Sequence, residues 1–451
     1  MKTEIDITKS CEWLGEFWCI ENEKLKYPGI LSYAPKGEIK LTLLWDFEKT
    51  QDFFNNSKKY FNFIGNVSEL GKVSLMGCIR RGSYCDFGKY NKVEFLIQYF
   101  VNGAHLDNSK QQINGFHFSF PGFNKFCSPV EGMQLHNKDK IIEHKWNGLT
   151  FTIKNLHNVA YELKNLLLPY KNKKLVDKIL KDIDDSSLMI SEYTPFLIIN
   201  FDKSKNFTET IRFKYLVEKL FSIFLVQPIE ADKHYMTVQI ASQTETVQIM
   251  HTLPDNVNKE KVSDYFFLPV NLSMVKDIFP TIWKFWEEML QDEFNIINIV
   301  LTDKIFNRVM TGYQSLVVYE AYIQEWQVRY GTDKSLNDRH EHFFAENLSW
   351  TNDDLCEKLK QLLPNAKSVS DIAKSIADMR DCITHTDNKR RNDKKYKQHK
   401  NILEDEVSIS NICEILFVIF IRAIYNKMGI AESEHQKHNL VNQLRRWEKI
   451  E

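Results

Sequence analysis

The stretch VSDIAKSIADMRDCITH, residues 369–385, decides the fold of the last third of this chain. Its apolar residues recur at alternating spacings of three and four, which places them on one face of a helix suited to bundle packing. They are Val369, Ile372, Ile376, Met379 and Ile383. Ser368 and Asp371 form a capping-box pattern at the start. The sequence therefore predicts a capped amphipathic helix over 369–385.

The surrounding sequence predicts an all-α unit over 301–451. It contains an apolar stripe at helical spacing over 306–329, a short helix over 353–363 and a nearly all-apolar helix over 404–428. The last of these should be central, because a helix that is apolar on every side is buried. A polar helix over 432–449 would pack on the outside or on a partner. Short connections favour an antiparallel bundle.

The rest of the chain predicts two further domains and a multidomain α+β fold. Residues 1–165 contain strand-like runs separated by turn signals, which favour a β-rich sandwich or barrel. These runs are 38–45, 72–79, 92–101 and 116–120. We expect the aromatic side chains near the start, Trp13, Phe17 and Trp18, to fill the core of this domain. Residues 166–300 mix helical and strand patterns, as a second small domain or a bridge would.

Composition narrows the function classes. The 451 residues are 43% hydrophobic and 26% charged, with a net charge of −1, so any RNA site must be a local basic patch. No secretory signal or membrane-spanning run is visible, and we expect a cytoplasmic protein without membrane contact. Walker, G-x-S-x-G and H-E-x-x-H motifs are absent from the sequence, which argues against NTPase, α/β-hydrolase and zincin chemistry.

Metal-ligating residue types occur without the spacing of a metal site. Cysteines and histidines in the β-rich part lack any C-x2-C pair, so zinc is poorly supported and we expect no metal and no cofactor. They are Cys78, Cys85, His117, Cys127 and His136. A second polar cluster, Arg339, His340 and His342, is best interpreted as a solvated loop, with an accessory RNA contact as the alternative.

The motif that could carry chemistry is RDCITH, Arg380 to His385, followed by a segment over 386–400 with seven basic residues against two aspartates. Near neutral pH an imidazole can take the 2′-hydroxyl proton of RNA or give a proton to the leaving 5′-oxygen. A guanidinium can hold the scissile phosphate as charge builds up. The basic segment, net charge +5, would supply phosphate affinity. We expect RNA contacts from Lys389, Arg390, Arg391, Lys394 and Lys395. The alternative is a solvated helix end, where basic residues interact favourably with the helix dipole.

The spacing of the motif predicts a homodimer or a higher homo-oligomer. Five helical residues turn by about 500°, so Arg380 and His385 point roughly 140° apart and could line one groove if two copies of the helix met. Asp381 lies four residues before His385 and could orient its ring. Thr384 lies four residues after Arg380. Glu320 falls in the apolar stripe of 306–329 and needs a partner, either Arg380 or His385, or else a rim position with water access.

These residues also carry a resemblance to known families. Arg-Asp-x-x-x-His at the end of the third bundle helix resembles the R-x4–6-H motif of HEPN ribonucleases, although some of these have Asn where Asp381 stands. The front of the chain resembles the N-terminal domain of ApeA-type phage-defence proteins, in WLGEFWCIENEKLKYPGILSYAPKGEIKLTLL (13–44), VNGAHL (101–106) and FHFSFPGF (116–123).

The resemblance implies a metal-independent endoribonuclease with Arg380, Asp381 and His385 as active-site residues. It implies abortive infection, in which a phage component, such as a phage protein, triggers cleavage of host RNA such as tRNA. A rival hypothesis is a non-catalytic HEPN interaction module joined to a β-rich domain that senses a ligand or trigger. In that case Arg380 would form a structural ion pair.

Overall fold

The structure is a computed structural model in which the chain forms two compact units. Unit 1 comprises Met1–Lys125, Val130–Glu218 and Ile229–Lys261, and unit 2 comprises Phe126–Pro129, Lys219–Pro228 and Val262–Glu451. The residues that the structure describes are 5–6, 8–35, 37–45, 60–85, 91–127, 140–162, 189–227, 229–231, 233–240, 242–251, 268–290, 311–331, 335–384, 394–430 and 439.

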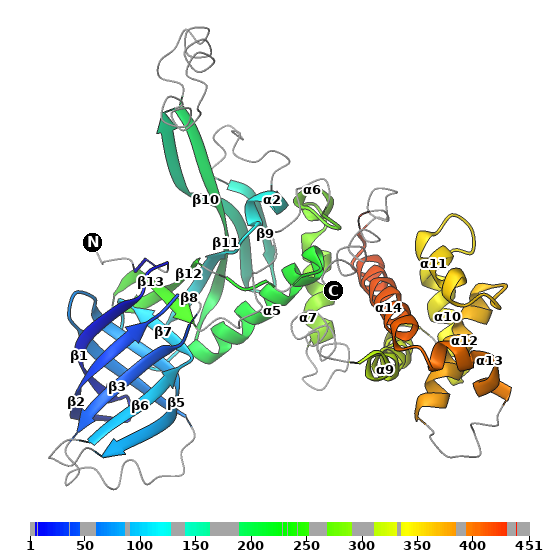
Figure 1. Cartoon of the computed structure of the whole chain (residues 1–451). Coiled ribbons are helices and arrows are strands. Elements are labelled where there is room, and N and C mark those ends of the chain that lie inside the picture. The colour runs from blue at the N-terminus through cyan, green and yellow to red at the C-terminus, as the bar shows by residue number, and fades with distance from the viewer. Residues whose placement is uncertain are drawn as a thin grey trace, which may run out of the picture. The chain divides into compact units, whose positions relative to one another are not determined.

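Unit 1 contains a closed antiparallel barrel (Figure 1). Its strands follow the order β4-β1-β2-β3-β6-β5, and a further pairing of β4 with β5 closes the ring. They are β1 (Cys11–Cys19), β2 (Asn22–Tyr33), β3 (Ile39–Trp45), β4 (Phe61–Val67), β5 (Gly71–Cys85) and β6 (Asn91–Ile97). Trp13 and Phe17 belong to the barrel core, as predicted, whereas Trp18 is buried against His105 outside that core cluster. The barrel is therefore filled by side chains, in the way small barrels are.

The sheet leaves the barrel at a break opposite Gly77. The first half of β5 pairs with β7 (Tyr99–Asn102), whereas its second half pairs with β6. Gly77 lies between the halves with φ +66°, and a Cβ there would lie 2.6 Å from the Gln98 side chain. Glycine is suited to this site because other residues rarely adopt positive φ. β6 and β7, which follow each other in the sequence, therefore pair with different halves of β5, and β7 begins a second run of strands.

This second run continues one sheet through the middle of the sequence. Its order is β7-β13-β12-β8-β11-β10-β9. The strands are β8 (Ile113–Ser119), β9 (Lys140–Trp146), β10 (Leu149–Glu162), β11 (Met189–Lys205), β12 (Lys233–Ile240) and β13 (Gln243–His251). Helix α5 (Phe207–Leu225) packs Phe213 against Phe116 and Phe201 of this sheet. The predicted boundary near 165 lies outside the described residues, and strands from both sides of it share the sheet.

Unit 2 is helical, as predicted for its C-terminal part. Helix α14, nearly all-apolar, is buried along most of its length and is central. Tyr322 and Trp326 of α9 pack on its Phe420, with ring centroids 5.5 and 5.3 Å apart. The helices of unit 2 are α6 (Leu272–Val275), α7 (Phe279–Leu290), α9 (Gly312–Tyr330), α10 (Leu336–Asn347), α11 (Asp354–Leu362), α12 (Val369–Thr384), α13 (Lys394–Leu403) and α14 (Glu406–Lys427). The short helix α2 (Phe123–Cys127) has residues in both units. By length and composition alone α14 could cross a membrane, and 72% of its most apolar window is buried, as suits a central bundle helix.

Two predicted loops are helices. The cluster Arg339, His340 and His342 lies in α10, so the prediction of a solvated loop is wrong. Ser335 caps this helix by accepting from the Asp338 amide, and the following phenylalanines bury one face. The basic segment is also not all loop, because residues from Lys394 onward form α13. The predicted helix over 432–449 lies outside the described residues apart from residue 439.

Candidate functional site

The site begins with Arg380, which lies near the C-terminal end of α12. Its Nη2 donates to Glu320 Oε1 at 2.6 Å, and its Nη1 donates to Asp381 Oδ1 at 3.0 Å. The Arg380 side chain is 18% exposed, whereas that of Glu320, on α9, is 5% exposed. Glu320 therefore has the partner that its place in an apolar stripe required. A charge-assisted pair of this length fixes both groups.

Asp381 connects Arg380 to a second cation, Lys395 of α13. The second oxygen of Asp381, Oδ2, lies 3.5 Å from Lys395 Nζ, and Asp378 Oδ1 lies 2.6 Å from the same nitrogen. Asp378 and Asp381 lie three residues apart on α12, hence on one face. The hydrogen bond from Lys395 to Asp378 is the main cause that raises the pKa of the lysine. Lys395 is thus paired with two carboxylates of α12, although its side chain is 46% exposed.

His340 extends the network behind Glu320. It is 1% exposed, and its Nε2 lies 3.7 Å from Glu320 Oε1. Its Nδ1 lies 3.3 Å from the amide nitrogen Nε2 of Gln324. The amide NH₂ of Gln324 can only donate, so Nδ1 is the acceptor in this contact, and Nε2 is the ring nitrogen that faces the carboxylate. The sequence held a signal for this burial, since Phe343 and Phe344 follow His340 at helical spacings of three and four.

Thr384 supports the end of α12 rather than the guanidinium. Its hydroxyl donates to the carbonyl oxygen of Arg380 at 3.1 Å. His385 follows directly in the sequence and lies outside the described residues, as do three of the predicted RNA-binding residues, Lys389, Arg390 and Arg391. The structure thus assembles Glu320, Arg380, Asp381 and Lys395 from three helices, and the contacts of His385 stay a prediction.

Another histidine lies close to this network. His399 of α13 is 4% exposed, and burial lowers its pKa although Asp378 opposes the shift. It lies four residues after Lys395, on the same face of α13. We assign His399 to the packing of α13 on α12, because a histidine whose side chain is removed from solvent is poorly placed to exchange protons with RNA.

The residues considered for a metal do not assemble into a site where the structure describes them. Within the described residues no group of three His, Cys, Asp or Glu side chains could hold a metal ion. Cys78 and Cys127 are buried, and burial raises the pKa of both thiols. His117 stacks on Tyr235 at 5.0 Å. The side chain of Cys85 and the whole of His136 lie outside the described part of the chain.

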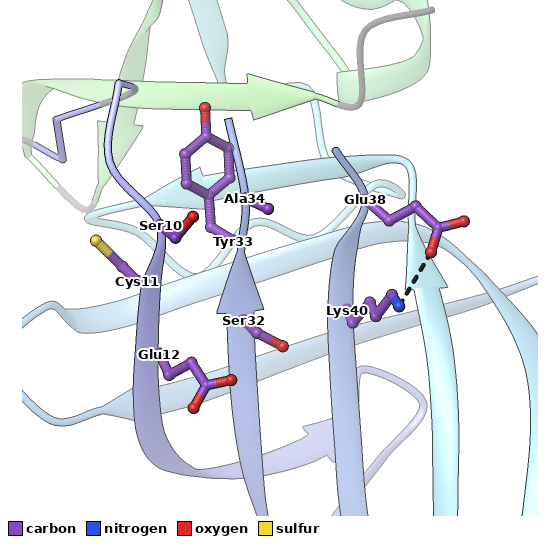
Figure 2. A pocket seen from close by; sticks show the side chains of 8 residues that line it. All are labelled: Ser10, Cys11, Glu12, Ser32, Tyr33, Ala34, Glu38 and Lys40. Carbon is purple, nitrogen blue, oxygen red and sulfur yellow. Dashed lines mark ion pairs between the residues drawn. The ribbon is translucent and has the colours of Figure 1, made fainter. Parts of the chain in front are cut away.

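A hollow of about 490 Å³ lies beside barrel strands β1, β2 and β3 (Figure 2). It is lined by Ser10, Cys11, Glu12, Ser32, Tyr33, Ala34, Glu38 and Lys40. The Glu38 carboxylate pairs with Lys40 at 3.1 Å and also with Arg81. Both pairs are solvent-exposed, and such pairs contribute little energy. Figure 2 shows the pair of Glu38 and Lys40 on one side of the hollow, with the Glu12 carboxylate on another strand. The charged network of unit 2 is therefore the better candidate for chemistry.

Fold and site together define a multidomain α+β protein, with a barrel-bearing sheet unit and a helical unit that carries a partly buried arginine network. The model of the family described as ApeA N-terminal domain 1 matches residues 12–286, more than half of the chain. The chain therefore belongs to the ApeA family of antiphage defence proteins. The match crosses residue 165 and ends before α9, so it does not include Arg380. No curated protein and no solved structure matches the chain.

Proposed function

We propose that this protein is a metal-independent endoribonuclease of phage defence whose helical unit is of the HEPN type. The observation that carries the proposal is the held position of Arg380. Its guanidinium is fixed by two carboxylates at the end of a helix, five residues before His385. A segment rich in lysine and arginine, residues 386–400, follows His385 directly. A cation next to a histidine beside a basic segment is what metal-free RNA cleavage requires.

The reaction would be an internal transfer at phosphorus. His385 takes the proton of the 2′-hydroxyl, the 2′-oxygen forms a bond to phosphorus, and the bond to the 5′-oxygen breaks. The leaving 5′-oxygen takes up a proton from an acid, which in a composite site would be the His385 of a second copy. Arg380 stabilises the charge that builds up on the phosphate oxygens. The products would carry 2′,3′-cyclic phosphate and 5′-hydroxyl ends.

The proposal extends to partners and to the place of action. Membership of a phage-defence family supports host RNA, such as tRNA, as the substrate and a phage component, such as a phage protein, as the trigger. We expect a cytoplasmic homodimer or higher homo-oligomer joined through the helical units. The β-rich unit would sense the trigger or restrain the nuclease.

RNA cleavage in EDTA tests the proposal. Purified wild type and His385→Ala are incubated with total tRNA, with and without lysate proteins from phage-infected cells. We expect wild-type cleavage that survives EDTA and is abolished in the mutant. If both proteins fold and neither cleaves under any condition, or if both cleave equally, the proposed chemistry is wrong.

The second candidate is a non-catalytic interaction module. It is favoured by the same ion pairs, because an arginine bound by two carboxylates with 18% of its side chain exposed is also what a structural ion pair looks like. Arg380→Lys separates the two functions. Lysine keeps a positive charge beside Glu320 but loses the fork that binds a phosphate bidentately. A nuclease should lose most of its activity in this variant while it stays folded, whereas a module should keep its partner binding.

A further inference from the structure

Lys395 is among the predicted RNA contacts, but its ammonium is already placed between two carboxylates of α12. Nζ lies 2.6 Å from Asp378 and 3.5 Å from Asp381. The Asp378 side chain is only 10% exposed, so this carboxylate depends on Lys395 for compensation. The Lys395 side chain is 46% exposed, so a phosphate can reach its third N–H, but a phosphate that drew Nζ away from α12 would leave Asp378 buried with its charge uncompensated.

The second contact links Lys395 to the arginine. One oxygen of Asp381 accepts from Arg380 and the other faces Lys395, so this carboxylate bridges the two cations. Charges thus alternate along one line, from Glu320 through Arg380 and Asp381 to Lys395 and Asp378. Without Lys395, Oδ2 of Asp381 would lose the cation that holds this carboxylate in its orientation. Asp381 would then turn, and Arg380 would lose one of the two carboxylates that orient its guanidinium.

We infer that Lys395 is a positioning residue that holds Arg380 in its working orientation through Asp381. The inference rests on the proposed ribonuclease function and changes the role of one residue within it. Rates of transfer reactions depend steeply on placement, and a displacement of about 1 Å can cost about 100-fold. Loss of Lys395 should therefore slow the cleavage step and leave the affinity for RNA nearly intact.

The test is single-turnover cleavage of tRNA in EDTA by the full-length protein, titrated to saturation. For Lys395→Met we expect a maximal rate about 10- to 100-fold lower and a half-saturating concentration within about twofold of wild type. Lys395→Arg should restore most of the rate, because a guanidinium can make both contacts. Lys374→Met is the matched control. It removes an exposed charge from α12, and its maximal rate should equal that of wild type.

A further variant keeps the test valid if Lys395→Met unfolds because Asp378 is left uncompensated. Asp378→Asn combined with Lys395→Met removes that buried charge but still leaves Asp381 without its lysine. Its maximal rate should stay as low as we expect for Lys395→Met. If the double variant instead recovers the wild-type rate, Lys395 serves only to compensate Asp378, and the inference is overturned.

Two other outcomes would also overturn it. A raised half-saturating concentration with an unchanged maximal rate would make Lys395 an ordinary phosphate contact, with the salt dependence of binding reduced accordingly. A faster maximal rate would make the contact inhibitory. These results differ from failure of the proposed function, in which wild type itself would cleave no RNA and the inference would fall with it.

Discussion

Replacing Glu320 by Gln tests whether the buried carboxylate holds the bundle together around Arg380. The change keeps the size of the side chain and a hydrogen-bonding oxygen, but it removes the charge that faces Arg380 Nη2 at 2.6 Å. Breaking a fully buried pair costs about 3–5 kcal/mol. Arg380 is 18% exposed and keeps Asp381, so the cost should be smaller. We expect about 1–2 kcal/mol, toward the lower end of the roughly 1.5–3 kcal/mol of a hydrogen bond to a charged group, because the substituted amide oxygen can still accept from Arg380.

Hydrogen exchange of the native protein is the suitable assay, because a chain with two units need not unfold in one step. Peptides from α9 and α12 should exchange about 5- to 30-fold faster in Glu320→Gln, which corresponds to the expected loss of free energy. Peptides from the barrel strands should be unchanged. This pattern would localise the effect to the helices that the ion pair joins.

Glu325→Gln is the matched control on the same helix. Glu325 pairs with Arg329 at 2.9 Å, but the side chains are 21% and 28% exposed. Surface pairs at this helical spacing contribute about 0.3–0.5 kcal/mol, so exchange should change by little more than twofold. Equal effects of the two substitutions would refute the reasoning, because burial of the Glu320 pair would then add nothing.

Three further predictions concern other parts of the fold. Arg422→Met should destabilise unit 2 by about 3–5 kcal/mol in urea unfolding, because it leaves the buried Asp353, 2.7 Å from Arg422, uncompensated; a loss below about 1 kcal/mol would contradict this. Burial lowers the pKa of His234 well below 6.5, so the unfolded state binds more protons as the pH falls below 6.5. The melting temperature of unit 1 should therefore drop between pH 7 and pH 5, and His234→Phe should flatten the dependence. Gly65→Ala should destabilise the barrel by about 1–3 kcal/mol in thermal unfolding, because the new Cβ would lie 2.5 Å from the Phe17 ring; an unchanged melting temperature would show that Phe17 can move aside.

Helical periodicity predicted most of unit 2, because local spacing alone decides which face of a helix is apolar. It predicted the start of α12 at Val369, and it predicted that α14 is central. It missed α10, whose sequence LNDRHEHFFAEN contains few apolar residues. The apolar signal there comes from Phe343 and Phe344, and packing of Phe343 on Phe420 of α14 stabilises what local propensity leaves marginal.

The closure of the barrel could not be read from the sequence. Strands were visible from their alternation, but the pairing of β4 with both β1 and β5 joins segments up to about 50 residues apart. Nor does local pattern show that β6 and β7 part at Gln98, since KVEFLIQYFV reads as one strand. The contacts of the candidate site were likewise only partly predictable, because they join residues far apart in the sequence. The place of Glu320 in a stripe showed that it needs a partner, whereas the contacts of Asp378 with Lys395 depend on how α13 folds back.

The charge balance of the network separates orientation from attraction. Arg380 and Lys395 carry two positive charges, and Glu320, Asp378 and Asp381 carry three negative charges, a net charge of −1 for these five side chains. A phosphate approaching Arg380 therefore meets no net attraction from these residues. In addition, Asp381 competes with the phosphate for the guanidinium of Arg380. Attraction would have to come from Lys389, Arg390 and Arg391, which follow His385 in the sequence.

Three such contacts to single-stranded RNA give a slope of about −2 for log affinity against log salt. A triple substitution of these residues by Gln should remove that slope and leave the cleavage rate at saturation unchanged, because on this argument Arg380 orients the phosphate that they capture. A fall in the saturated rate instead would place one of them beside the reacting phosphate.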